Sequence, residues 1–204
     1  MLAQYGKDGL AYQRYGRLKQ DGLGDDILAG NSLSIVGLFQ SIYGVNPLYN
    51  RFYLDPHITP ELTGTELKYN FHDQRLTINL RTDAYAVSNN QFRVISKKNF
   101  GFNATRDHLS WFSGADPLPS LTVTTEAPMT ITILTWKSTT REWKQEAPKS
   151  PGNLTKYVIS QLAPDTEYSI SIDKRAARRA RTDSNGDLQL QTPASGITEI
   201  KIAL

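Results

Sequence analysis

The sequence contains no cysteine in its 204 residues. Disulfide bonds, thiolate metal sites and a cysteine nucleophile are therefore excluded. Its three histidines, His57, His72 and His108, never have the spacing of three or four residues that places two ligands on one helical face. The sequence therefore predicts no metal site, and nothing in it requires a cofactor.

Long apolar runs and known catalytic signatures are also missing. No run approaches the roughly 18 uninterrupted apolar residues of a membrane span, and the N-terminal segment lacks the apolar h-region of a signal peptide. The chain has no G-x-S-x-G nucleophile elbow, no phosphate-binding G-x-x-x-x-G-K-[ST] and no G-x-G-x-x-G after a strand. We therefore predict no catalytic residue in this chain.

Asp55 and His57, in "LDPHI", form the most catalytic-looking pair of side chains. Pro56 stands between them and places both in a rigid turn. A histidine close to an aspartate is also common by chance. A small enzyme that uses this pair is therefore a weaker hypothesis than a role for the pair in architecture.

The chain also has little excess of either charge, because its formal net charge is only +3. Much of that excess lies in "DKRAARRAR", residues 173–181. A strand pattern precedes this stretch and a turn signal follows it, which favours a solvated hairpin. Arg178, Arg179 and Arg181 are the candidate residues for binding a polyanion. Nucleic acid is not the expected partner, because the stretch has no interleaved aromatic residues.

One helix is indicated, over residues 26–43. Apolar residues recur at spacings of three and four from Ile27 to Tyr43 and form a wide stripe. Gly44 is placed to end the helix, and Pro47 prevents its continuation. The glycine-rich segment before it is expected to be irregular. No second helix is indicated, so we expect the stripe to pack on the first sandwich or on another chain.

Period-two patterns dominate after Pro47 and predict strands of five to eight residues separated by turns. "ELKYNFHDQRLTINLRT" predicts a hairpin with its turn at residues 72–74. The fold class is mainly β, with two antiparallel β-sandwich domains preceded by one helix. The loop-like "SGADPLPS", residues 113–120, is the best boundary. We expect a helix-containing segment at 1–46, a first sandwich at 47–116 and a second at 117–204.

The clearest motif is "LAPDTEYSISI", which contains Leu162, Pro164, Thr166 and Tyr168. It resembles the L-x-P-x-T-x-Y tyrosine corner of fibronectin type III domains, in which the tyrosine hydroxyl bonds back to the corner backbone. The resemblance covers about residues 119–204 and implies that Trp136 is a core tryptophan. In "TDSNGDLQL", Asn-Gly favours a plain hairpin turn over a calcium loop.

Large aromatic rings are more numerous than two small cores require. Exposed rings stack on the apolar faces of sugars, and Tyr49, Tyr53 and Trp143 are the candidate glycan-binding residues. Trp143 lies in the polar stretch "TTREWKQEAP" and is expected to be the most exposed tryptophan. Packing in the core is expected for Trp111 and Trp136.

Residues 27–82 resemble the C-terminal passage of bacterial glycoside hydrolases built on an (α/α)6 barrel. The resemblance rests on "YGVNP" after an apolar helix, on "LYNRFYLDPHIT", and on the strand pair "TELKYNFHDQRLTINL". It implies that residues 1–43 are the end of a barrel. It also implies that the catalytic acid and base lie upstream, so no catalytic residue is carried over to this chain.

Two functions follow as hypotheses. The first is a non-catalytic C-terminal β-sandwich region of a carbohydrate-active enzyme, structural or weakly glycan-binding. Its partners would be polysaccharide or the catalytic domain of that enzyme, its location would be periplasmic or extracellular, and its helix stripe could self-associate. The alternative is a free-standing adhesion or interaction module that binds a protein or polyanion through its loops and basic hairpin.

Overall fold

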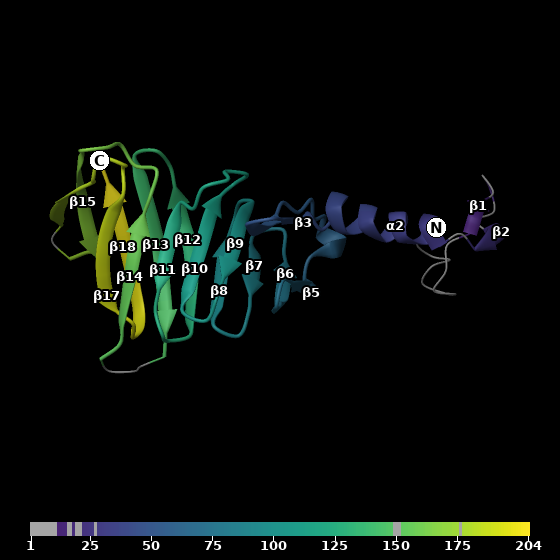
Figure 1. Ribbon diagram of the computed structural model, residues 1–204, viewed down its shortest axis with the longest axis horizontal. Coiled ribbons are helices and arrows are strands. Elements are labelled where there is room, and N and C mark those ends of the chain that lie inside the picture. Colours follow the sequence, from purple (N-terminus) through teal and green to yellow (C-terminus); the bar gives the residue numbers. More distant parts are fainter. Residues whose placement is uncertain (1–11, 16–17, 19–21, 27, 149–151, 176) are drawn as a thin grey trace.

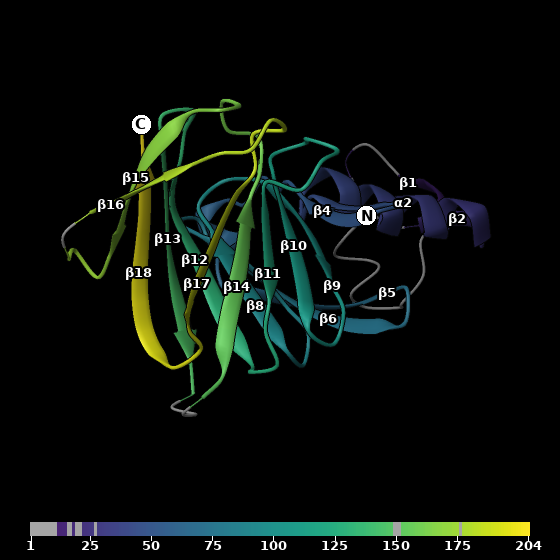
Figure 2. The same ribbon diagram turned by 60° about the vertical axis from the view of Figure 1, so that its left-hand side comes forward.

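The structure is a computed structural model, and it describes residues 12–15, 18, 22–26, 28–148, 152–175 and 177–204. Two large sheets lie face to face, and one long helix extends away from them (Figures 1 and 2). The described chain is mainly β with one α-helix, so the predicted fold class is confirmed at this level.

The first sheet has seven strands in the order β17-β14-β11-β10-β9-β4-β3, all antiparallel to their neighbours. The bounds of these strands along the chain are β3 Val45–Leu48, β4 Arg51–Leu54, β9 Phe100–Ala104, β10 His108–Ser113, β11 Leu121–Thr124, β14 Leu154–Ile159 and β17 Leu188–Pro193.

The second sheet has nine strands in the order β16-β15-β18-β13-β12-β8-β7-β6-β5, and its single parallel pair is β8 with β12. Their bounds are β5 Thr65–Phe71, β6 Gln74–Leu80, β7 Tyr85–Ser88, β8 Phe92–Ser96, β12 Met129–Trp136, β13 Thr140–Ala147, β15 Glu167–Ile172, β16 Arg178–Arg181 and β18 Gly196–Ala203. A 3-10 turn, η1, spans Pro60–Leu62.

The core lies between the two sheets and forms one contiguous cluster of apolar side chains. Alternate residues of the strands supply it, as period-two patterns require: in β17 the buried residues are Leu188, Leu190 and Thr192. Strand pairing crosses the predicted boundary at residues 116 and 117 in both sheets, through β10 with β11 and β8 with β12. Independent folding of the two halves stays a prediction.

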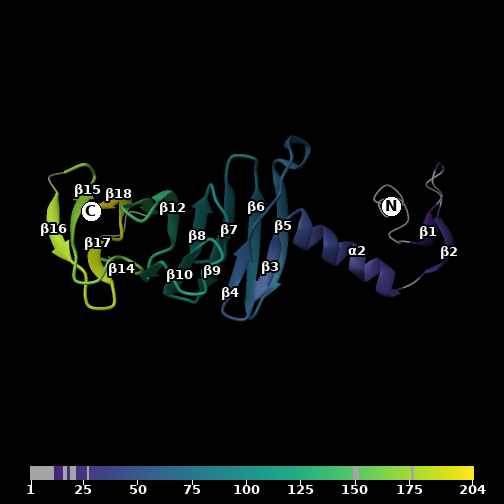
Figure 3. The same cartoon turned by 90° about the horizontal axis from the view of Figure 1, so that it is seen from above.

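The N-terminal part contains the helix and one small strand pair. Helix α2 spans Leu28–Ser41, slightly shorter than the predicted 26–43. β1 (Tyr12–Tyr15) pairs with β2 (Gly22–Asp26), so the expected irregular structure is wrong for these residues. The other residues before 27, apart from residue 18, lie outside the described part. Figure 3 shows α2 leaving the sandwich beside β3 and β5 and leading to this strand pair.

Two local predictions are confirmed. The hairpin of β5 and β6 turns at His72 and Asp73, and Phe71 pairs with Gln74. At the tyrosine corner, the backbone N–H of Ala163 donates to the Tyr168 hydroxyl at 3.0 Å. Tyr168 is buried, so this bond holds the entry to β15.

The Asn-Gly segment is a turn, as predicted, but it does not connect the two strands of a hairpin. Asp183 accepts backbone N–H bonds from Asn185 and Asp187 at 2.9 and 2.8 Å, so the segment is a turn. However, the strands on either side, β16 and β17, belong to different sheets and do not pair. The hairpin prediction is wrong because the turn carries the chain across the sandwich. Gly186 is required there, since its φ is +79° and an added Cβ would lie 2.2 Å from the Leu162 carbonyl oxygen.

Removal of the corner hydroxyl tests this part of the fold. Tyr168→Phe leaves the Ala163 N–H without its acceptor, and we expect the free energy of unfolding to fall by about 1 kcal/mol. Urea unfolding followed by circular dichroism measures the change. Tyr49→Phe is the control, because the Tyr49 side chain is 97% exposed. Equal stability of the two variants would contradict the corner's role.

Candidate functional site

The junction between the helix and the sandwich is built from backbone contacts. The N–H of Asp55 donates to the Gly44 carbonyl and the N–H of His57 to the Ile42 carbonyl, both at 2.9 Å. Gly44 has φ +64°, and an added Cβ would lie 2.0 Å from the carbonyl carbon and oxygen of Asp55. Only glycine allows this approach. The segment "LDPHI" therefore fastens the last turn of the helix to the sandwich.

The side chains of Asp55 and His57 have separate surroundings. The Tyr53 hydroxyl donates to the Asp55 carboxylate at 3.4 Å, whereas the His57 side chain is exposed. Among the described residues, no hydrogen bond joins Asp55 to His57. The geometry gives the enzyme hypothesis no support.

Among the residues whose side chains the structure describes, those at the C-terminal end of the helix meet the sandwich. Phe39 and Tyr43 contact each other edge to face at 5.7 Å between ring centroids and pack against the core. Nearer the N-terminus of α2, the exposed fraction of the residue is 71% for Leu33, 38% for Ile35 and 48% for Val36. The prediction that the apolar stripe packs on the first sandwich is therefore wrong for these three residues. Packing on another chain stays a prediction.

Tyr49 lies in the β3–β4 turn, and Tyr53 lies on β4, which follows that turn. Tyr49 is almost fully exposed in that turn. Tyr53 is half-buried on β4, and its hydroxyl accepts from the Asn99 amide at 2.7 Å. Burial raises the pKa of the Tyr53 hydroxyl, and the neighbouring Asp55 carboxylate raises that pKa further. Tyr53 is thus held in place, whereas Tyr49 is accessible.

Trp143 corrects the sequence analysis, because its side chain is fully buried. It lies on β13, where Arg141, Trp143 and Gln145 point inward and the polar residues between them are less buried. Its ring packs against those of Trp136 and Tyr157, with centroids 6.2 and 5.4 Å apart. The polar flanks reflected strand alternation and not exposure. A buried ring cannot stack on a sugar, so Trp143 is not a binding residue.

The three candidate arginines lie on β16, an edge strand of the nine-stranded sheet. β15 and β16 form the predicted basic hairpin. Arg179 pairs with Glu167 at 2.6 Å, and the Arg181 Nε donates to the Asp165 carbonyl at 2.9 Å. Arg178 is exposed. A charged edge strand also resists pairing with other chains, so polyanion binding stays a prediction.

A pocket that the sequence analysis missed lies between the two sheets, at the β8–β9 and β12–β13 turns. We call it the tryptophan pocket. It has a volume of about 280 Å³. Its lining comprises Ser96, Lys97, Lys98, Asn99, Trp111, Ser113, Gly114, Ile133, Leu134, Thr135, Trp136 and Lys137. The only local signal was a lysine next to each of two strand ends, in "SKKN" and "WKS".

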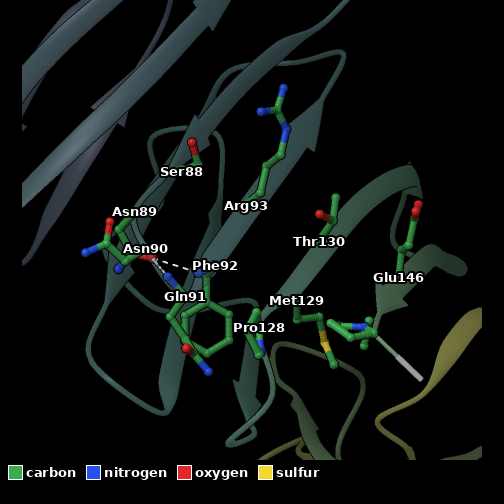
Figure 4. Close-up of a pocket in the computed structure, with 12 residues that line it drawn as sticks. Ser88, Asn89, Asn90, Gln91, Phe92, Arg93, Pro128, Met129, Thr130 and Glu146 are labelled. Carbon is green, nitrogen blue, oxygen red and sulfur yellow. Dashed lines mark hydrogen bonds between the residues drawn. The ribbon is translucent and has the colours of Figure 1, made fainter. Parts of the chain in front are cut away.

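A larger and more open pocket, of about 490 Å³, lies at the β7–β8 turn and is lined by amide side chains (Figure 4). Asn89 accepts backbone N–H bonds from Gln91 and Phe92 at 2.9 and 2.7 Å, so its oxygen already shapes the turn. Arg93 and Glu146 give the lining both signs of charge. Phe92, Pro128 and Met129 also line the pocket, so its surface is mixed polar and apolar and shows no preference for one ligand charge.

No protein-family model, no curated protein and no solved structure matches this chain. In the part of the chain that the structure describes, no group of three or more metal-ligating side chains occurs, and no helix is long and apolar enough to cross a membrane.

Proposed function

We propose that this chain is a non-catalytic β-sandwich region that braces a helical domain of a carbohydrate-active enzyme. The observation that carries the proposal is the junction, where Asp55 and His57 hold the end of α2 by two backbone hydrogen bonds. A helix fixed in direction at one end and apolar beyond it suits a second layer of helices.

The exposed stripe supports the same reading. Leu33 and Val36 are three residues apart and lie on neighbouring positions of one helical face. Their exposure, 71% and 48%, is costly for a helix that has no partner. The enzyme class rests on the resemblance of residues 27–82 to glycoside hydrolases with an (α/α)6 barrel. The fibronectin-like character of the last part rests on the corner at Tyr168.

Bracing is better supported than glycan binding at the predicted aromatic residues. Tyr49 is exposed, but the neighbouring Tyr53 hydroxyl is engaged by Asn99, and Trp143 is buried. One exposed ring offers a small stacking surface.

The junction predicts a specific sensitivity at Gly44. Gly44→Ala forces both an unfavourable positive φ and a clash with the Asp55 backbone, and we expect a loss of about 3 kcal/mol or more in unfolding free energy. Gly64→Ala is the matched control, because Gly64 has φ +88° with nothing within 4 Å of an added Cβ. We expect about 1 kcal/mol there. Chemical denaturation compares the two, and equal losses would show that the close approach does not matter.

The stripe predicts that the chain associates when it lacks its helical partner. Leu33→Glu with Val36→Glu should turn concentration-dependent oligomers into monomers without changing the melting temperature of the sandwich. Light scattering after size exclusion gives the mass. Leu118→Glu with Ile197→Glu is the control, because both residues are exposed and lie outside the helix. A monomeric wild-type chain at all concentrations would contradict this prediction.

The proposed function is tested by the coding sequence upstream of residue 1 and by the hydrolytic activity of this chain. We expect an in-frame (α/α)6 barrel upstream of residue 1, no hydrolysis of polysaccharides by this chain alone, and lower thermal stability of the barrel in Gly44→Ala. Hydrolysis that disappears in Asp55→Ala would overturn the non-catalytic assignment. Absence of a barrel in the reading frame would overturn the bracing role.

The adhesion alternative predicts retention on heparin. Under the bracing proposal, we expect wild type to elute from heparin early, at low salt. Replacement of Arg178, Arg179 and Arg181 by glutamine should then shift elution no more than replacement of Arg106, Lys156 and Lys201, which are exposed and lie outside the basic hairpin. A strong loss confined to the arginine variant would favour the alternative.

A further inference from the structure

The tryptophan pocket combines an aromatic wall with basic turns. Trp111 and Trp136 supply the wall, with ring centroids 4.6 Å apart in an edge-to-face contact. Trp111 comes from β10 of the seven-stranded sheet and Trp136 from β12 of the nine-stranded sheet. The pocket therefore lies where the two sheets meet at one end of the sandwich.

A β-bulge determines the direction of Trp136. The pairing of β12 with β13 shifts between Ile133 and Thr135, so that Leu134 has no direct partner. Without the bulge, alternation from the buried Ile131 and Ile133 would turn Trp136 outward. With it, Trp136 stays half-buried and lines the pocket. Bulges commonly redirect side chains in this way next to binding sites.

The charge of the pocket has one sign. Lys97, Lys98 and Lys137 line it and are exposed, and no carboxylate is among its described lining residues. Within the described chain, none of these lysines forms a salt bridge, whereas Lys68 pairs with Glu66. The guanidinium of Arg141 lies 5.0 Å from the Trp136 ring centroid and adds a further cation nearby. The local potential favours an anion.

Polar groups of the lining can also serve a polyhydroxylated ligand. Asn99 uses its amide nitrogen on the Tyr53 hydroxyl, and its oxygen lies 3.9 Å from where a Cβ of the pocket residue Gly114 would stand. Trp111 is buried, and its indole N–H has no hydrogen-bond partner among the described residues. The side-chain oxygen of Asn99 can therefore accept a hydrogen bond from a ligand hydroxyl group, in addition to the lysine donors and the aromatic wall.

We propose that the tryptophan pocket binds a carboxylated sugar ring, with the carboxylate among Lys97, Lys98 and Lys137 and the apolar face of the ring toward Trp136. A volume of about 280 Å³ suits a single ring. This site goes beyond the bracing role, and its lining includes none of Gly44, Asp55 and His57.

Intrinsic fluorescence reports directly on this site, because all three tryptophans of the chain belong to the Trp111–Trp136–Trp143 contact series. We expect glucuronate and galacturonate, as monomers and short oligomers, to change the emission in a saturable way. Glucose and galactose, which differ by the missing carboxylate, should give no saturable change. Raising the salt concentration should weaken the response.

Lysine variants test the assignment. Replacement of Lys97, Lys98 and Lys137 by glutamine should weaken uronate binding about tenfold, as expected for three solvent-exposed charges. The matched control replaces Lys156, Lys174 and Lys201, which removes the same charge from exposed positions outside this pocket, and should change affinity less than twofold. Calorimetry with the same ligands confirms the affinities.

Three results would overturn the proposal. They are an equal response to glucose and glucuronate, an equal saturable response to acetate, and unchanged affinity in the pocket triple variant. Each can be obtained while the Gly44 and helix variants behave as expected, so failure of the pocket is distinguishable from failure of the bracing role.

Discussion

The two sheets depend on a series of aromatic contacts between them, from Trp111 through Trp136 and Trp143 to Tyr157. The first and last rings belong to the seven-stranded sheet and the middle two to the nine-stranded sheet. Such contacts contribute about 0.5–1.5 kcal/mol each beyond the area they bury. Gln145 completes the arrangement, because it is fully buried, accepts from Tyr157 and Thr192, and donates to the Pro193 carbonyl. The position of one sheet against the other therefore depends on these directional contacts as well as on the burial of apolar surface between them.

The same aromatic contacts explain why the pocket lies where it does. Trp143 and Tyr157 close the core, whereas Trp136 stands at its end, turned inward by the bulge at Leu134. A half-buried ring at the end of a sandwich leaves space beside it, and the turns that carry Lys97 and Lys137 border that space. The inward position of Trp136, and with it the aromatic wall of the pocket, thus follows from one strand irregularity.

Sequence reasoning succeeded where the determinants were local. The β5–β6 hairpin, the corner at Tyr168 and the end of the helix shortly before Gly44 each depend on a few neighbouring residues. It failed at Trp143, because polar neighbours on a strand mark the opposite face and not the exposure of the residue between them. The order of the strands was not predictable, since the parallel pairing of β8 with β12 joins distant segments. The tryptophan pocket was missed for the same reason, because Lys97 and Trp136 meet only after both sheets form.

The pocket and the junction are connected through a short series of contacts. Asn99, which lines the pocket, holds the Tyr53 hydroxyl, and the backbone of Asp55, two residues further along, holds Gly44 at the end of the helix. Because Tyr53 and Asp55 are on one short extended segment, a ligand in the pocket would be held on the side of the sandwich that carries the helix. A sandwich that braces a helical domain would in this way keep a bound sugar next to that domain. The position of Tyr53 then matters as a support for Asn99, and its ring need not contact the sugar.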